Sequence, residues 1–341
     1  MATLKQIGAE LGLSPATVSR ALNGFPEVNR DTREKVREVA DRLGYRPNRV
    51  AQRLVTGRSG MVGLIIKIRA DMSADQTFFE MLTGLTAALG QHDVDLVLAV
   101  DQGDDPVKPY IKLMERNILD GFILNAPVPD DPRVGFLQEK GIPFVMHGQT
   151  AEKATYPFFG IDNRAVSRVS VDHLVGLGHR RIALINGAAH LAFAQDRLQG
   201  FRAAMAAHGF SVPEPRILQN AETEAEGHAA AREMLTVSDP SRPTAFVCVS
   251  TVVAAGVMRA IAETGLRVPD DVSVVAHDDA LPQMQAVNFV PALTVTRAPL
   301  YDACQPLADH LVVAIAGGAP RQELVDAAFI VRGSSGPVPH A

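Results

Sequence analysis

The sequence predicts an α/β protein with an all-α head at its N-terminus, a short connecting helix, and two doubly wound parallel-sheet lobes. Residues before about 46 carry helix caps and a helical apolar period. From Met61 onward, continuous apolar runs typical of buried parallel strands alternate with amphipathic helices. Roughly 280 residues of such repeats exceed one mononucleotide-type sheet, so two lobes that face each other are expected.

The head contains start and stop signals for three short helices. Thr3 is placed to cap the first helix, and Gly12 supplies a turn. Ser14 is a good N-cap and Pro15 suits a first helical position, so a second helix begins there. Asn29 caps a third helix in the same way. The apolar residues expected to form the core of the head are Leu4, Ile7, Val18, Leu22, Val36, Val39 and Leu43.

The second helix of the head is the stretch that suggests DNA. Val18 and Leu22 share one face, whereas Ala16 and Arg20 share the other. Two helices joined by a glycine turn, with small residues and an arginine facing outward, are typical of a helix-turn-helix that enters a major groove. An ordinary helical hairpin with a solvated arginine fits the same pattern, so this stretch alone leaves both interpretations open.

A marginal helix is expected between the head and the lobes. Pro47 breaks the chain, Asn48 can cap a new helix, and Gly57 can end it. A helix of roughly eight residues is too short to be stable alone in water. It should order only when something packs on it, which makes it a candidate switch.

The net charge of −5 is unevenly distributed. The residues through Ser59 carry a net charge of +5, and the remainder carries −10. A basic head on an acidic body predicts that a polyanion would meet only the head, although a solvated charge cluster fits the same count.

The lobes are expected to hold a ligand, with no support for dinucleotide binding, phosphate chemistry or a metal site. Ligands of such sheets bind beyond the carboxyl ends of the strands, hence in the cleft between lobes. The sequence contains no G-x-x-x-x-G-K-[ST] and no G-x-G-x-x-G that opens a helix. The two cysteines, Cys248 and Cys304, form neither a disulfide framework nor a metal-ligand spacing. The expected strands are 61–66, 95–100, 119–125, 143–147, 181–186, 244–250, 272–277 and 292–296.

No apolar run reaches the roughly 18 residues that a membrane span needs, and the N-terminus does not resemble a secretory signal. We therefore expect a cytoplasmic protein.

Five motifs together resemble the LacI/GalR (lactose repressor) family of bacterial transcriptional regulators, over essentially the whole chain. They are TLKQIGAELGLSPATVSRALNG (3–24), LGYRPNRVAQRLVTGRSGMVGLII (43–66), HLVGLGHRRIAL (173–184), DRLQGFRAAM (196–205) and VPDDVSVVAHDD (268–279). The resemblance implies lobes of the periplasmic-binding-protein type. It also implies a helix-turn-helix DNA-binding domain (1–46), a hinge helix and linker (47–59), and a two-lobed effector-binding and dimerisation domain (60–341).

The same resemblance implies a ligand-responsive repressor that binds a near-palindromic operator as a homodimer. Arg20, Pro15 and Ala16 would face base edges. Leu54 would be a wedge between the central base pairs, or else a small hydrophobic contact with the body. Phosphates would meet Thr3, Ser14, Thr17, Asn23 and Thr32. The minor groove would meet Asn48, Arg49, Ala51 and Gln52.

In the cleft, Arg197 and Asp278 match the effector-binding arginine and aspartate of the family. A guanidinium and a carboxylate can hold the vicinal hydroxyls of a sugar, although a buried ion pair fits as well. The remaining expected effector contacts are Phe78, Phe79, Phe159 and Ser250. The segment Phe193–Arg197 is similar to that of regulators of α-glucoside utilisation.

The sequence departs from the family pattern at two single residues, Thr251 and His277, and in the segment His147-Gly148-Gln149. The chain also lacks the apolar heptad tail that makes some members tetrameric, which favours a dimer. A sugar-binding transport protein shares the two-lobed fold, but the basic head argues against it. An enzyme is not expected, because no nucleophile–base spacing or metal set is present, and no cofactor is implied.

Overall fold

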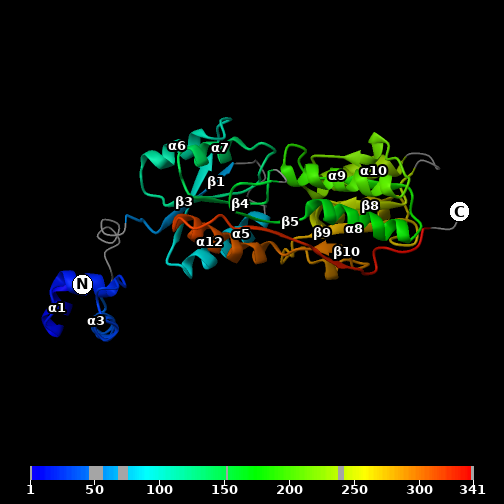
Figure 1. Ribbon diagram of the computed structural model, residues 1–341. Coiled ribbons are helices and arrows are strands. Elements are labelled where there is room, and N and C mark those ends of the chain that lie inside the picture. The colour runs from blue at the N-terminus through cyan, green and yellow to red at the C-terminus, as the bar shows by residue number, and fades with distance from the viewer. Residues whose placement is uncertain (1, 46–56, 68–75, 151–152, 237–241, 339–341) are drawn as a thin grey trace. The chain divides into compact units, whose positions relative to one another are not determined.

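The structure is a computed structural model that describes residues 2–45, 57–67, 76–150, 153–236 and 242–338 (Figure 1). The chain divides into two compact units, Met1–Ser59 and Gly60–Ala341. No helix within the described residues is long and apolar enough to cross a membrane.

The first unit contains the three helices that the caps predict: α1 (Leu4–Leu11), α2 (Pro15–Leu22) and α3 (Arg30–Arg42). The side chains of Thr3, Ser14 and Asn29 accept backbone N–H groups of the first helical turns, so each predicted N-cap is confirmed.

The core of this unit is formed by one face of each helix. Ile7, Val18 and Val36 are fully buried. The predicted core residues Leu4, Leu22 and Leu43 are only partly buried and pack around that centre. Gly8 was not singled out in the sequence, yet a Cβ there would collide with the Leu13 carbonyl. Glycine is therefore what allows the turn after α1 to pass so close to the helix.

The second unit begins with a six-stranded parallel sheet in the order β11-β5-β4-β3-β1-β2. Helices α5 and α12 cover one face of this sheet, and α6 and α7 cover the other (Figure 1). The strands are β1 (Met61–Lys67), β2 (Asp95–Asp101), β3 (Gly121–Leu124), β4 (Phe144–His147), β5 (Phe158–Ile161) and β11 (Gln322–Val325). The helices are α5 (Gln76–Gly90), α6 (Lys108–Glu115), α7 (Pro132–Glu139) and α12 (Cys304–Ile315).

The second lobe has a six-stranded sheet in the order β12-β10-β9-β8-β6-β7, parallel except for the β10–β12 pair. Helices α8 and α9 pack on one face, and α10 and α11 on the other. The strands are β6 (Ile182–Ile185), β7 (Ile217–Leu218), β8 (Ala245–Cys248), β9 (Ser273–Asp278), β10 (Thr294–Arg297) and β12 (Ala328–Ile330). The helices are α8 (Asn163–Gly176), α9 (Ala192–Ala207), α10 (Glu224–Leu235) and α11 (Thr251–Glu263), with 3₁₀ turns η2 (Glu214–Arg216), η3 (Ala286–Asn288) and η4 (Leu300–Ala303).

The chain passes between the lobes three times: from β5 to α8, from β10 to α12, and from β11 to β12. All eight predicted strands are present. The strands β5, β7, β11 and β12, which have two to four residues, were not predicted.

Candidate functional site

The outward face of α2 presents the residues that the sequence predicts for base contact. Pro15, Ala16 and Arg20 are exposed. The Ser14 hydroxyl caps α2 and lies 2.9 Å from the Thr17 hydroxyl. The face is thus a small-residue surface with one cation, at a helix N-terminus whose remaining N–H groups favour an anion.

The predicted phosphate contacts of the head lie mostly at helix ends. Thr3 caps α1, and the Thr32 N–H donates to Asn29 Oδ1 at 2.8 Å. Asn23 ends α2 and its Nδ2 donates to the Ser19 carbonyl at 2.8 Å. Their contacts with DNA remain predictions, as do those of Asn48, Arg49, Ala51, Gln52 and Leu54, which lie outside the described residues.

Arg197 lies in the first half of α9 and is almost fully buried, with 6% of its surface exposed. Its Nε donates to Asn163 Oδ1 at 2.9 Å, and its Nη1 donates to the Val249 carbonyl at 2.8 Å. The Phe193 ring centroid lies 5.2 Å from the guanidinium carbon. Burial lowers the pKa of Arg197 to about 10, and the Asp279 carboxylate opposes this shift. The guanidinium therefore remains charged at neutral pH.

The two aspartates at the end of β9 have different surroundings. Asp278, the predicted effector contact, is buried; it accepts the Ala280 N–H at 2.8 Å and lies 3.7 Å from Arg297 Nε. Asp279 is 28% exposed. Burial raises its pKa, but neighbouring His277, Arg197 and His147 outweigh burial, so the pKa lies below its ordinary value. Asp279 is thus the carboxylate that interacts with Arg197, whereas Asp278 holds the turn after β9.

His147 ends β4 in the first lobe, and its Nδ1 lies 3.2 Å from Asn125 Oδ1. Burial lowers the pKa of His147 to about 4, and Asp279 of the second lobe opposes the shift. The imidazole is neutral at pH 7. Neutral His147 of the first lobe and ionised Asp279 of the second lobe therefore interact electrostatically.

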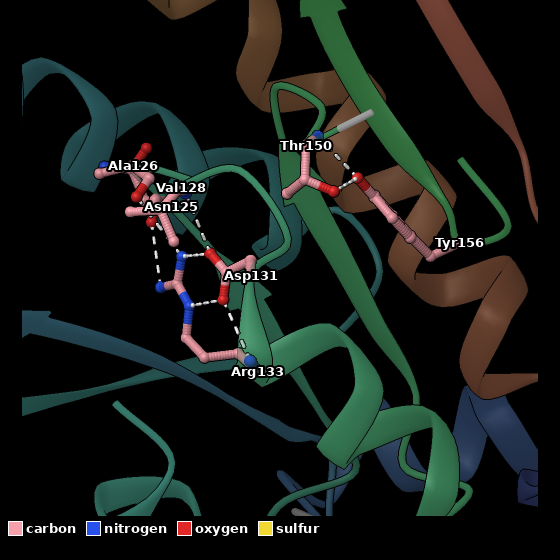
Figure 2. A network of polar contacts seen from close by, with 7 residues as sticks. All are labelled: Asn125, Ala126, Val128, Asp131, Arg133, Thr150 and Tyr156. Carbon is pink, nitrogen blue, oxygen red and sulfur yellow. Dashed lines mark hydrogen bonds and ion pairs between the residues drawn. The ribbon is translucent and has the colours of Figure 1, made fainter. Parts of the chain in front are cut away.

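A buried ion pair fixes the loop from Asn125 to Asp131 that lies beside His147 (Figure 2). Arg133 Nε and Nη2 donate to the two carboxylate oxygens of Asp131 at 2.8 and 2.6 Å. The remaining donors of Arg133 reach the carbonyls of Asn125 and Ala126, and the Val128 N–H donates to Asp131. Asn125, Ala126 and Val128 of the loop are thus all tied to one arginine–aspartate pair.

The tip of this loop contacts the second lobe. The Pro127 carbonyl accepts the N–H of Ala192, the first residue of α9, at 2.9 Å. The helix that carries Arg197 therefore meets the first lobe directly at its N-terminus.

Ser250 is the N-cap of α11, where its hydroxyl accepts the Val253 N–H at 3.2 Å. It follows Val249, whose carbonyl holds Arg197, and its hydroxyl hydrogen can still be donated to a ligand.

The predicted aromatic contacts belong to the first lobe. Phe78 and Phe79 lie at the start of α5 with ring centroids 5.5 Å apart, and Phe79 is 53% exposed. Phe159 is buried in the core cluster beneath α5 and α12. The structure brings Arg197 and Ser250 to one edge of the second sheet, whereas Phe159 packs in the core of the first lobe.

The sequence analysis did not single out Asn125, Asn163 and Asn186. Asn125 and Asn186 follow a buried strand directly, and Asn163 follows β5 by two residues. A polar residue just after a buried parallel strand lies at the ligand-binding edge of the sheet, and this signal could have identified Asn125 and Asn186. It could not have identified Asn163, because β5 was not predicted.

A three-helix head with an exposed arginine face, joined to a two-lobed body with polar groups between the lobes, defines a DNA-binding regulator controlled by a small molecule. Residues 3–48 match the bacterial regulatory proteins of the lacI family, and residues 171–335 match the periplasmic binding protein-like domain. The chain is 40% identical to the HTH-type transcriptional regulator AglR of Rhizobium meliloti (strain 1021) over 339 residues, which is 98% of this chain and 95% of AglR. The protein belongs to the lacI family of transcriptional regulators.

Two solved structures are similar over nearly the whole chain. The complex of the transcriptional regulator CelR with cellobiose has a TM-score of 0.71 and 29% identity, and covers 98% of this chain and 100% of CelR. The lac repressor dimer bound to operator and the anti-inducer ONPF has a TM-score of 0.78 and 25% identity. The match covers 98% of this chain and 99% of the lac repressor chain. The relatives are transcriptional regulators, and the protein is a regulator rather than an enzyme.

Acid should destabilise the two-lobed unit through His147. The unfolded chain takes up a proton on this residue below about pH 6.5, whereas the folded protein resists it until about pH 4. The contribution of His147 to the free energy of unfolding is therefore fully present above pH 6.5, and it is lost as the pH drops from 6.5 towards 4. Buried His277 and His179 and partly buried His173 act in the same direction, because desolvation lowers their pKa values.

We expect the melting temperature to fall over this pH range, and to fall less steeply in His147→Gln. His190→Gln, at an exposed position, is the matched control and should keep the wild-type slope. Equal slopes for wild type and His147→Gln would contradict the assignment.

Proposed function

We propose that the protein is a homodimeric repressor that binds a near-palindromic operator and responds to a polyhydroxylated small molecule, a sugar, held between the two lobes. The domains are a DNA-binding head (1–46), a hinge (47–59) and an effector-binding and dimerisation body (60–341). A protein that acts on bacterial operator DNA works in the cytoplasm. Support comes from the operator-bound lac repressor dimer and the cellobiose complex of CelR, both of which resemble this chain.

The observation that carries the proposal is the cluster of Arg197, Asp279 and His147, drawn from both lobes. The guanidinium donates, the carboxylate accepts, and the neutral imidazole can do either, which suits neighbouring hydroxyls of a sugar. The carbonyls of Asp278 and Asp279 also accept the N–H groups of Ala298 and Leu300 at 3.1 Å. The cluster is therefore tied to the segment that crosses from β10 to α12.

This connection gives the response a physical route. A ligand that contacts both lobes stabilises one relative position of the lobes over another. The ligand strengthens DNA binding if it binds more tightly to the DNA-binding state, and weakens DNA binding if it binds more tightly to the other state. The proposed readout is the hinge, whose marginal helix orders on DNA when the paired bodies hold it in place.

In the head, Arg20 is the proposed base reader, since an arginine fork matches the two acceptors of guanine. Pro15 and Ala16 are proposed to select by shape and by methyl contact. Replacing Arg20 with alanine should weaken binding to the cognate operator by roughly 5- to 150-fold and relax base preference at one position in each half-site. Fluorescence anisotropy with operator duplexes that carry single base changes measures both effects.

Arg37→Ala is the matched control, since it removes an exposed arginine from α3 of the same unit. It should lower affinity slightly and equally for all duplexes, through charge alone. If Arg20→Ala bound the operator as tightly as wild type, Arg20 would not read a base.

The effector site can be tested by thermal unfolding with cellobiose and a panel of other mono- and disaccharides. A ligand at about 100 times its Kd stabilises the folded protein by about 2.7 kcal/mol. We expect Asp279→Asn and Arg197→Lys to reduce the rise in melting temperature that a bound sugar causes. Asp278→Asn should lower the melting temperature of the sugar-free protein, because it weakens the turn at Ala280, and should keep the rise. The reverse pattern for the two aspartates would assign the ligand contact to Asp278.

The proposed dimer contact lies at the edge of the first sheet. β2 is an edge strand on which Leu98 and Val100 are 40% and 51% exposed, and neighbouring α5 exposes Phe79. An apolar edge strand left open to water invites pairing with another chain. A two-fold dimer also supplies the two heads that a near-palindromic site requires.

We expect Leu98→Asp and Val100→Asp to shift the protein from dimer to monomer in sedimentation analysis, and to weaken operator binding as a consequence. Leu324→Asp is the matched control, because Leu324 is 45% exposed on β11, the opposite edge of the same sheet. A dimer that survives both β2 substitutions would place the interface elsewhere.

A further inference from the structure

A small polar cavity lies in the second lobe, and Arg197 forms part of its wall. It is bounded by α8 and by the carboxyl ends of β6, β8, β9 and β10, and it has room for about one water molecule. Its polar lining consists of Ser167, Ser170, Asn186, Arg197, His277 and Thr296. Two of the buried polar atoms in this lining, Asn186 Oδ1 and His277 Nε2, have no hydrogen-bond partner among the described residues.

Asn186 follows β6 directly and is completely buried. Its Nδ2 donates to the Ala194 carbonyl at 2.8 Å, which fixes the orientation of the amide. A flipped amide would place two oxygens against each other, so Oδ1 is the atom that remains without a donor. A buried carbonyl oxygen without a donor is costly, which indicates that something in the cavity supplies one.

His277 lies on β9 and is 2% exposed. Its Nδ1 lies 3.0 Å from Thr296 Oγ1, and its Nε2 lies 3.4 Å from Asp279 Oδ1, a distance too long for a well-formed hydrogen bond. Burial lowers the pKa of His277, so the ring is neutral and carries one proton. The nearby carboxylate favours that proton on Nε2, and the Thr296 hydroxyl then donates to Nδ1. His277 therefore presents a donor to the same cavity in which Asn186 presents an acceptor.

We propose that this cavity is a binding site for a single hydroxyl oxygen, which accepts from His277 Nε2–H and donates to Asn186 Oδ1. Ser167 and Ser170 in the wall can offer further partners, as a buried oxygen with two to four polar neighbours requires. The oxygen comes either from a resident water or from a hydroxyl group of the sugar that Arg197 contacts. Only the second source rests on the proposed function.

The two sources have different consequences for specificity. A resident water would fill the cavity beside Arg197 and would not change the preference of the site for one sugar over another. A sugar hydroxyl in the cavity makes the site discriminate strongly against the corresponding deoxy sugar, because Asn186 and His277 would be left unpaired.

Crystal structures of the full chain, without sugar and with a bound disaccharide from the thermal screen, test the proposal. We expect a density peak within hydrogen-bonding distance of both Asn186 Oδ1 and His277 Nε2. A peak present without sugar and separate from a bound sugar identifies a water. A peak continuous with the sugar identifies a ligand hydroxyl. A cavity that is empty in both crystals overturns the proposal. The sugar-free crystal decides the water source even if no sugar binds.

NMR of protein with ¹⁵N-labelled histidine gives a solution test. The Nε2–H proton of His277 should show magnetisation transfer from water in the sugar-free protein, and Asn186→Leu should abolish the transfer and shift the Nε2 resonance. His179 is the internal control: it is also buried, but Thr244, Ser273 and the Gly336 carbonyl already partner its ring nitrogens, so its signals should not move. No transfer in wild type together with an unchanged His277 signal in Asn186→Leu would contradict the resident water.

Discussion

A single buried guanidinium organises the ligand-binding edge of the second lobe. Arg197 reaches from α9 to Asn163 at the start of α8 and to the Val249 carbonyl after β8, and it interacts with the carboxylate of Asp279. A buried charge is tolerated only when its neighbours compensate it. The ends of two strands, β8 and β9, and the start of α8 must therefore converge on this residue.

The first lobe also contains a buried arginine whose charge is compensated by a neighbouring carboxylate. Arg133 and Asp131 are 13% and 1% exposed, and removing one partner would leave the other charge buried and uncompensated. The loop that they hold includes Ala126 and Asp130 at φ values of 50° and 51°, a backbone conformation that persists only when its surroundings enforce it. The second lobe thus meets a rigid surface at Pro127 rather than a mobile loop.

Much of the fold and part of the candidate site could be predicted from the sequence. The caps at Thr3, Ser14 and Asn29 are local signals, and the eight apolar strands are sustained runs, so both were identifiable from residue order alone. Which of Asp278 and Asp279 interacts with Arg197 was not, because successive residues at the end of a strand point in opposite directions and a turn follows at once. Asn163 and Asn186 find their partners on α9 of the same lobe, whereas the interaction of His147 with Asp279 depends on the crossings that bring the two lobes together.

The three crossings also determine when each part of the protein can be completed during synthesis. The head is contiguous in sequence, so its core exists as soon as α3 has emerged. Neither lobe is contiguous, since the first sheet receives its edge strand β11 only at Gln322 and the second receives β12 only at Ala328. Chains fold from the N-terminus as they are made. A nascent chain therefore carries a finished DNA-reading head well before either lobe is whole.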